Sequence, residues 1–177
     1  MKREMKIVQY DENWTNQFNE IKAKLLLIFG DLATDIQHFG STSIKGMSAK
    51  PIIDVMVIVS NIKEVDALNE KMIEAGYVPK GENGVDGRRY FQMLSDDGIN
   101  HMQHIHCYEK ENQQVADELM FRDFLRIDKD AFDAYLAIKI EASQKYRYLP
   151  SEYTEYKTDC INKIMKRAKL CYMNGYQ

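Results

Sequence analysis

The sequence predicts an α+β fold in which a mixed, twisted sheet is flanked by helices and covered by a C-terminal helical layer. Short β-rich segments bounded by turn residues recur between residues 35 and 108. Helical periodicity occurs before them and once between them, and it dominates from about residue 111. We therefore expect one domain over residues 1–177, with a sheet core at about 1–110 and C-terminal helices at about 111–174.

Helical patterns begin at residue 11 and again at residue 61. The first, residues 11–30, places these apolar positions on one face: Trp14, Phe18, Ile21, Leu25, Ile28 and Phe29. The second, residues 61–76, opens with a capping signature at Asn61 and ends at a glycine. After residue 110 three further helices are expected, and Asp128 and Ser151 are predicted caps for the last two.

Five segments are predicted strands: residues 35–39, 51–59, 77–78, 88–94 and 100–108. The second is a continuous apolar run with Asp54 near its middle, which is typical of a buried strand. A crossover helix is expected between the second and third strands. Turn compositions at 81–84 and 95–98 predict that the later strands pair antiparallel.

Composition narrows the classes of function. The formal net charge of -3 gives no basic field, so general nucleic-acid binding is not expected. Cys107, Cys160 and Cys171 form no CxxC pair, which favours reduced thiols and a cytoplasmic location. No apolar run reaches membrane-spanning length, so no membrane partner is expected. The sequence leaves the oligomeric state open.

The stretch from Gly40 to Val57 is the most informative in the chain. It reads as a small-residue turn, Gly40-Ser41-Thr42-Ser43, then a loop with two lysines, then an apolar strand carrying Asp54. An unpaired carboxylate buried in such a strand costs several kcal/mol, so Asp54 should face a cleft, a cation or a donor group. Gly, Ser and Thr beside a basic loop suit a phosphate. Together these features indicate a cleft for a nucleotide and a metal ion.

His104 and His106 alternate on one predicted strand, so their side chains leave the same face and would converge on Asp54 if the two strands are neighbours. Imidazole beside one carboxylate favours Mn²⁺ or Zn²⁺, or a general base near neutral pH. The alternative is a hydrogen-bonded histidine pair on a half-buried strand. His38 and His101 are expected to be peripheral.

Basic residues supply candidate phosphate ligands. Arg88 and Arg89 are adjacent on a strand and point to opposite faces, so at most one can enter the cleft with Asp54. Lys50 stands at the mouth of the strand, whereas Lys45 lies out in the loop, so Lys50 is the better candidate. The alternative for each is a solvated surface cation.

A Gly-Ser turn followed by a strand aspartate resembles the nucleotidyltransferase superfamily of the DNA polymerase β type. In that superfamily two acidic residues at alternate strand positions hold Mg²⁺ against a nucleoside triphosphate, which implies this role for Asp54. The second acidic position is Met56 in this chain. A thioether has negligible affinity for Mg²⁺, so the resemblance does not extend to a carboxylate pair.

The chain is identified as resembling the GrpB family, compact relatives of that superfamily, on motifs spread along nearly its whole length. They are Tyr10-Asp11-x-x-Trp14, the segment 38–54, Arg88-Arg89-Tyr90-Phe91, His104-Ile105-His106, Phe121-Arg122-Asp123-Phe124-Leu125-Arg126, and Tyr153-Thr154 with Lys157. The resemblance implies a nucleotidyltransferase-like fold. It raises Arg122 and Asp123 as candidates that face the substrate or support residues that do, with an ion pair that ties helix to sheet as the alternative, and it raises Lys139 and Lys157 as cleft candidates by position. It also extends to an accessory domain fused to dephospho-CoA kinases.

The leading hypothesis is binding of a nucleotide or another phosphorylated small molecule with a divalent metal, Mg²⁺ or Mn²⁺. The reaction would be transfer from a nucleoside triphosphate to a small acceptor, with Asp54, His104 and His106 as catalytic and metal-binding residues. The expected binding set is Gly40, Ser41, Thr42, Ser43, Lys50, Arg88, Arg89, Arg122 and Lys157. The alternative is a non-catalytic ligand- or partner-binding domain that lost its second carboxylate at Met56, and a metal-dependent hydrolase is a third. Whether the protein is an enzyme stays open at this stage.

Overall fold

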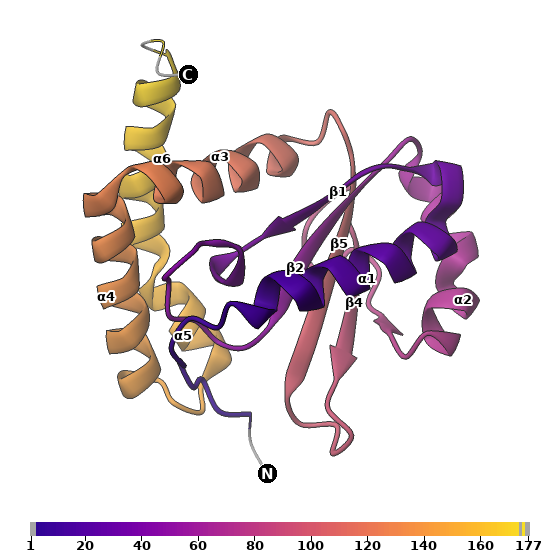
Figure 1. The fold of residues 1–177 in the computed structure, drawn as a ribbon, viewed down its shortest axis with the longest axis horizontal. Helices are drawn as coiled ribbons and strands as arrows, with labels where there is room; N and C mark the ends of the chain where they lie inside the picture. The colour runs from indigo at the N-terminus through magenta and orange to yellow at the C-terminus, as the bar shows by residue number, and fades with distance from the viewer. Residues whose placement is uncertain (1–2, 174, 176–177) are drawn as a thin grey trace.

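The computed structural model describes residues 3–173 and 175 of the 177-residue chain. At its centre is a five-stranded sheet in the order β1-β2-β5-β4-β3 (Figure 1). The strands are β1 Ala33–Phe39, β2 Ile53–Val59, β3 Val78–Pro79, β4 Arg89–Leu94 and β5 His101–Glu109. β2 and β5 run parallel and the other neighbouring pairs run antiparallel, which confirms the predicted mixed sheet.

Helices flank the sheet, and those that follow β5 in the chain lie together on one side of it. The α-helices are α1 Asn13–Phe29, α2 Asn69–Glu74, α3 Gln113–Ile127, α4 Lys129–Lys145, α5 Pro150–Tyr156 and α6 Thr158–Met173. Short 3₁₀ helices are η1 Gly30–Leu32, η2 Ser41–Ser43 and η3 Ile62–Leu68. In Figure 1, α1 lies across the sheet while α3 to α6 form a separate layer, so the α+β prediction is confirmed.

Three local expectations change. The crossover begins as the 3₁₀ helix η3, with the Asn61 side chain accepting from the Lys63 N–H at 3.0 Å, and only its second half is α-helical. Ser151 is not a cap, because Pro150 already occupies the first turn of α5. Asp54 is the second residue of β2 rather than its middle, so its carboxylate stands at the end of the sheet where the preceding loop arrives.

The two faces of the sheet carry different chemistry. On one face, β2 and β5 residues such as Val55 and Ile105 pack with Trp14 and Leu25 of α1 in the largest apolar core. On the other face, the same strands present Asp54, His104 and His106, and farther along Met56 and Tyr108 are covered by α3. Strand alternation therefore separates the core from a polar face.

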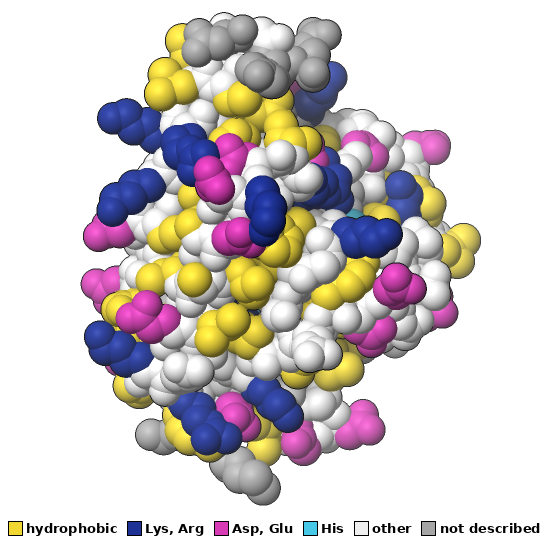
Figure 2. All heavy atoms as spheres, turned by 60° about the vertical axis from the view of Figure 1, so that its left-hand side comes forward, with side chains coloured by type: hydrophobic (Ala, Val, Ile, Leu, Met, Phe, Trp, Pro, Cys, Tyr) yellow, Lys and Arg dark blue, Asp and Glu magenta, His cyan; other side chains and the backbone are white. Residues whose placement is uncertain are grey.

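The helical layer is also amphipathic. Figure 2 shows its outer face, on which Lys and Arg side chains are interspersed with Asp and Glu and with apolar patches, without a field of one sign. Among the described residues, none of the helices combines the length and apolar character that crossing a bilayer requires.

Arg122 on α3 ties the helical layer to the sheet. Its Nη1 donates to Gln37 Oε1 at 2.9 Å and to the His38 carbonyl at 3.0 Å, both on β1. Its Nε and Nη2 donate to the two carboxylate oxygens of the neighbouring Asp123, at 2.7 and 2.9 Å. Arg122 thus bridges β1 and α3, and its role as a ligand-binding residue stays a prediction.

Replacing Arg122 should therefore reduce stability. We expect Arg122→Ala to lower the free energy of unfolding by about 2–3 kcal/mol, because charged hydrogen bonds to buried carbonyl groups are lost. Urea denaturation measures this. Lys129→Ala is the control: Lys129 is 83% exposed and pairs with Asp133, so a change below about 0.5 kcal/mol is expected. Equal effects of the two substitutions would contradict the assignment.

Candidate functional site

The Asp54 carboxylate packs closely against the backbone of Gly40. A Cβ atom built on Gly40 would lie 2.5 Å from Asp54 Oδ2, and the φ angle of Gly40 is +67°, so only glycine fits at this position. Burial by itself raises the pKa of Asp54, but the hydrogen bond and charge of His104, together with His106 and Lys50, bring that pKa below its ordinary value. The carboxylate is thus held ionised at the sheet end.

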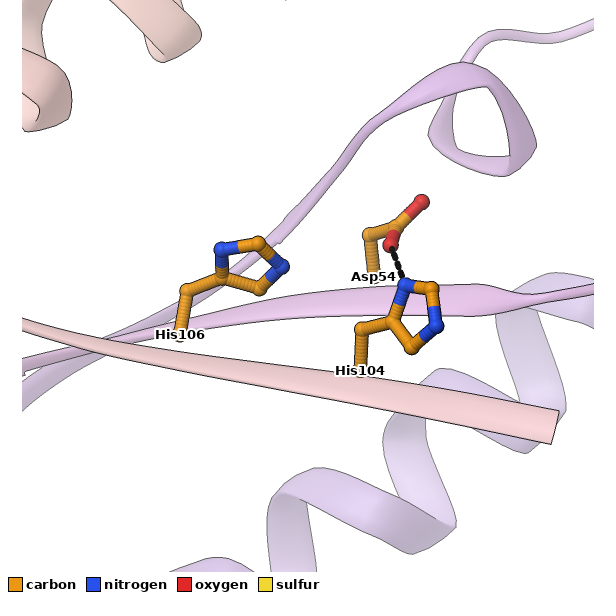
Figure 3. Close-up of side chains that lie close together, drawn as sticks. All are labelled: Asp54, His104 and His106. Atoms are coloured by element: carbon orange, nitrogen blue, oxygen red, sulfur yellow. Dashed lines mark hydrogen bonds and ion pairs between the residues drawn. The ribbon is translucent and has the colours of Figure 1, made fainter. Parts of the chain in front are cut away.

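Two histidines of β5 stand beside this carboxylate (Figure 3). His104 is paired with Asp54 in the parallel ladder, and its Nδ1 lies 2.9 Å from Asp54 Oδ1. His106, two residues on, shares the face, and one ligand atom from each of the three residues lies within 4.8 Å of the others. Burial lowers the pKa of His106 to about 3, so its ring is neutral at pH 7, and its buried Nε2 has no hydrogen-bond partner among the described residues. The three side chains therefore form a group that could hold a metal ion.

His101 contacts His104, contrary to the expectation that it is peripheral. The pairing of β4 with β5 skips Met102, since Leu94 pairs with His101 and Met93 with Gln103. Such a bulge turns a side chain to the other face, and His101 Nδ1 lies 2.8 Å from His104 Nε2. Strict alternation along β5 would have placed His101 opposite His104, so the sequence pattern could not reveal this contact.

Lysines from three separate segments meet beside Asp54. A cavity of about 150 Å³ is lined by Lys50 at the entrance to β2, Lys139 of α4 and Lys157 between α5 and α6, together with Gly40 to Thr42, Asp54 and His104. Lys50 and Lys157 place their Nζ atoms 4.7 and 4.4 Å from the ring centre of Tyr153. Lys139, 2% exposed, donates to the Ser48 carbonyl at 2.7 Å.

No carboxylate forms an ion pair with these lysines among the described residues, and their cationic forms are correspondingly disfavoured. Burial lowers the pKa of Lys50 and of Lys157 to about 8, with other cations adding to the effect at Lys50. Burial, then the charges of Lys157 and Lys50, lower the pKa of Lys139 to about 7. Unpaired buried cations around a cavity are the complement of an anion.

The turn hydroxyls are largely used within the protein. Thr42 Oγ1 donates to the Ile52 carbonyl at 3.2 Å, and Ser43 Oγ donates to the Gly40 carbonyl at 2.7 Å. Both therefore shape the turn, and Ser43 does not line the lysine cavity. Gly40, Ser41 and Thr42 are the turn residues that line it.

Arg88, just before β4, and Arg89, its first residue, reach different partners, as their adjacent positions predict. Arg89 forms a two-pronged ion pair with Asp66, at 2.6 and 2.8 Å, outside the cleft. Its guanidinium is therefore engaged by Asp66, and its binding role stays a prediction. Arg88 reaches His106 Nδ1 at 3.4 Å, but it also donates to the carbonyl groups of Glu82 and Asn83, so it borders the site mainly as a support.

Helix α3 packs against Met56, which stands at the strand position of the second metal-binding carboxylate in the superfamily that the sequence resembles. Met56 is fully buried with Phe39, Tyr108 and Val115. One turn after Val115, Glu118 has a pKa raised to about 7 by burial and by the nearby charges of Asp54 and Asp117. Sequence reasoning missed Glu118 because an acidic residue on a helix normally indicates a solvated face.

The donor set can be matched to a metal ion. One carboxylate and two imidazoles suit Mn²⁺ or Zn²⁺ better than Mg²⁺, which prefers oxygen ligands. The neutral state of His106 is the form that binds a metal. Asp54, His104 and His106 would hold such an ion next to the lysine cavity.

The fold is of the nucleotidyltransferase-like class. A family profile described as "GrpB protein" matches residues 4–167, and the chain belongs to the GrpB family. It is 39% identical to YqkA of Bacillus subtilis (strain 168) over 95% of its own length, and it spans about half, 48%, of that relative. A crystal structure of conserved protein GrpB from Enterococcus faecalis superimposes with a TM-score of 0.88 at 32% identity, covering 95% of this chain and 99% of that one.

More distant similarities concern the fold. The Cid1 poly(U) polymerase superimposes with a TM-score of 0.56 at 14% identity, over 85% of this chain and 49% of that one. A dephospho-CoA kinase of Mycolicibacterium paratuberculosis is 29% identical over 80% of this chain and 40% of its own length. The likeness to Cid1 shows a nucleotidyltransferase-type fold, in agreement with the resemblance seen in the sequence.

Restoring an acidic residue at position 56 should disrupt the fold rather than rebuild a metal site. We expect Met56→Asp to lower the free energy of unfolding by about 3–5 kcal/mol, because it buries an uncompensated charge among apolar groups. Met56→Leu, a volume-conserving control, should cost less than about 1.5 kcal/mol. Thermal and urea unfolding give both values. A stable Met56→Asp protein with tighter Mg²⁺ binding would refute this.

Anion affinity should fall as pH rises through the lysine pKa values. Below pH 7 the lysines are charged; between about pH 7 and 9 they lose protons, unless a bound anion raises their pKa. With sulfate, whose charge is constant in this range, calorimetry should show at least about a tenfold weaker affinity at pH 9.5 than at pH 6.5. Lys45→Met should leave this profile unchanged, and Lys139→Met should flatten it. An affinity independent of pH in the intact protein would argue against the lysine cavity as an anion site.

Proposed function

We propose that the protein binds a nucleotide or another phosphorylated small molecule, together with a divalent cation, between the Gly40 turn and the C-terminal helices. The observation that carries this is the meeting of Lys50, Lys139 and Lys157 in one cavity that Asp54 also lines, with none of the three lysines in an ion pair to a carboxylate among the described residues. A phosphate supplies the missing negative charge and accepts several hydrogen bonds at once.

The reaction that fits this site is nucleotidyl transfer to a small acceptor. Lysines would hold the phosphate oxygens, while Asp54, His104 and His106 would hold the metal ion. A bound ion would supply stabilisation of charge on the transferred phosphoryl group. The acceptor hydroxyl loses its proton as its oxygen bonds to the α-phosphorus and pyrophosphate leaves. In the alternative assignment, in which His104 does not ligate the ion, the His104 ring would accept this proton. The net charge of -3 favours a small acceptor over a polynucleotide.

A second candidate is a binding domain without turnover. The observation that favours it is the burial of Met56 under α3, which leaves β2 with one carboxylate in place of two. Such a domain would use the same lysines to hold a phosphorylated ligand. Binding with no product in the presence of Mn²⁺ or Mg²⁺ and a panel of small acceptors distinguishes it from a transferase.

Calorimetric titration with ATP, GTP, CTP, UTP and coenzyme A, each with Mg²⁺ and with Mn²⁺, tests the proposal. We expect at least one nucleotide to bind, with a preference for Mn²⁺ because two of the three metal donors are imidazoles. Asp54→Asn should remove the dependence on metal, and Lys139→Met should weaken binding about tenfold or more, as expected for a lost charged contact.

Lys45→Met is the matched control, since Lys45 is an exposed lysine of the same loop as Lys50 and does not line the lysine cavity. Circular dichroism of each variant confirms that the fold is kept. Absence of binding by the intact protein, or equal weakening by Lys45→Met and Lys139→Met, would refute the proposed site.

A further inference from the structure

A second, larger cavity adjoins the lysine cavity. Its volume is about 660 Å³, and it lies between the N-terminal segment, α1, the loop that enters β2 and the start of β5. Lys50 and Ile52 line both cavities, so the two spaces share a wall. A role for this larger cavity rests on the proposed function, since the cavity would hold the rest of the ligand whose phosphates the lysines would bind.

The volumes of the two cavities indicate that each would hold a different part of one ligand. Sites for whole small molecules are typically about 300–1,000 Å³. The lysine cavity, at about 150 Å³, has room for phosphate groups but not for a complete nucleotide. The larger cavity, at about 660 Å³, lies within the range for a ligand body. A ligand with its phosphates on Lys139 and Lys157 therefore has its nearest roomy space beyond Lys50.

The lining of the larger cavity indicates a polar heterocyclic body. Its walls carry the amides of Gln17, Asn100 and Gln103. Gln103 Oε1 accepts a hydrogen bond from the Tyr77 hydroxyl at 2.6 Å, which leaves its NH₂ group as the free donor. Neutral amides pair with the mixed donors and acceptors on the edge of a nucleobase. This set does not suit a lipid tail, which offers no polar groups to pair with.

Apolar and charged groups also line the larger cavity, and the charged ones include the acidic and basic side chains of Glu4, Lys6 and Asp11. Pro51, Ile52 and the half-exposed Met102 provide surfaces on which a flat ring can lie, and Glu20 provides an acceptor for sugar hydroxyl groups. Arg3 lines the same cavity and lies close enough to Asp54 for the carboxylate charge to raise its pKa, although burial lowers that pKa overall. A cation thus stands where the body of the ligand would join its phosphates.

We infer that the cavity between α1 and the start of β5 holds the nucleoside of a nucleotide whose phosphates occupy the cavity of Lys50, Lys139 and Lys157. The ligand then bends around Lys50, which contacts both of its parts. Binding of inorganic triphosphate requires the lysine cavity alone, whereas the additional affinity of a nucleoside triphosphate requires the larger cavity.

A substitution that fills the larger cavity distinguishes the affinity contributed by the nucleoside from the affinity contributed by the phosphates. Gln17 and Asn19 are both exposed residues of α1, but only Gln17 lines the larger cavity. Calorimetry in the presence of Mn²⁺ would compare inorganic triphosphate with ATP, GTP, CTP and UTP on the intact protein, Gln17→Trp and Asn19→Trp. In Gln17→Trp we expect about a tenfold or larger rise in the dissociation constant of the best nucleotide, with that of inorganic triphosphate changed less than about twofold.

Other results overturn the inference in distinguishable ways. Tight binding of inorganic triphosphate with no added affinity for any nucleotide would refute the nucleoside assignment while leaving the phosphate site in place. Equal effects of Gln17→Trp and Asn19→Trp on nucleotide binding would also refute it. If neither inorganic triphosphate nor any nucleotide binds, the proposed function and this inference both fail.

Discussion

The contact between the Asp54 carboxylate, the backbone of Gly40 and the ring of His104 constrains everything around it. Because a Cβ on Gly40 would meet Asp54 Oδ2 at 2.5 Å, the turn can approach only as glycine. The 2.9 Å contact to His104 connects the carboxylate to the parallel neighbour strand. A buried carboxylate needs such partners to stay ionised. The turn, two strands and the adjoining lysine cavity are thus organised around one negative charge.

The lysines beside that charge reduce stability in the absence of a ligand. The pKa of Lys139 falls from 10.5 to about 7, so between these values the unfolded chain binds more protons than the folded protein. Stability due to this group therefore increases as pH rises through that window, and keeping the charge at neutral pH opposes folding. Lysines whose only role was to pack the helical layer would gain nothing from this loss of stability. Under the proposed function, a bound phosphate would offset this cost.

Several residues that resemble ligand-binding groups in the sequence have other partners in three dimensions. Arg89 pairs with Asp66, and Arg122 bridges α3 to β1. The hydroxyls of Thr42 and Ser43 hold the turn itself. Residue type and spacing show which side chains could bind phosphate, but the partner that each one finds depends on segments distant in the chain. His101 is the converse case, since a bulge at Met102 brings it to His104.

The sequence by itself determined the α+β class, the Gly40 turn and the common face of His104 and His106, because glycine geometry and the two-residue period of a strand are local properties. Only the tertiary structure decided that β5 lies next to β2, which brings both histidines to Asp54. It also decided that lysines of the C-terminal helices converge there. Strand order and helix docking arise from long-range burial of apolar surface, and no local pattern encodes which distant side chains that burial brings together.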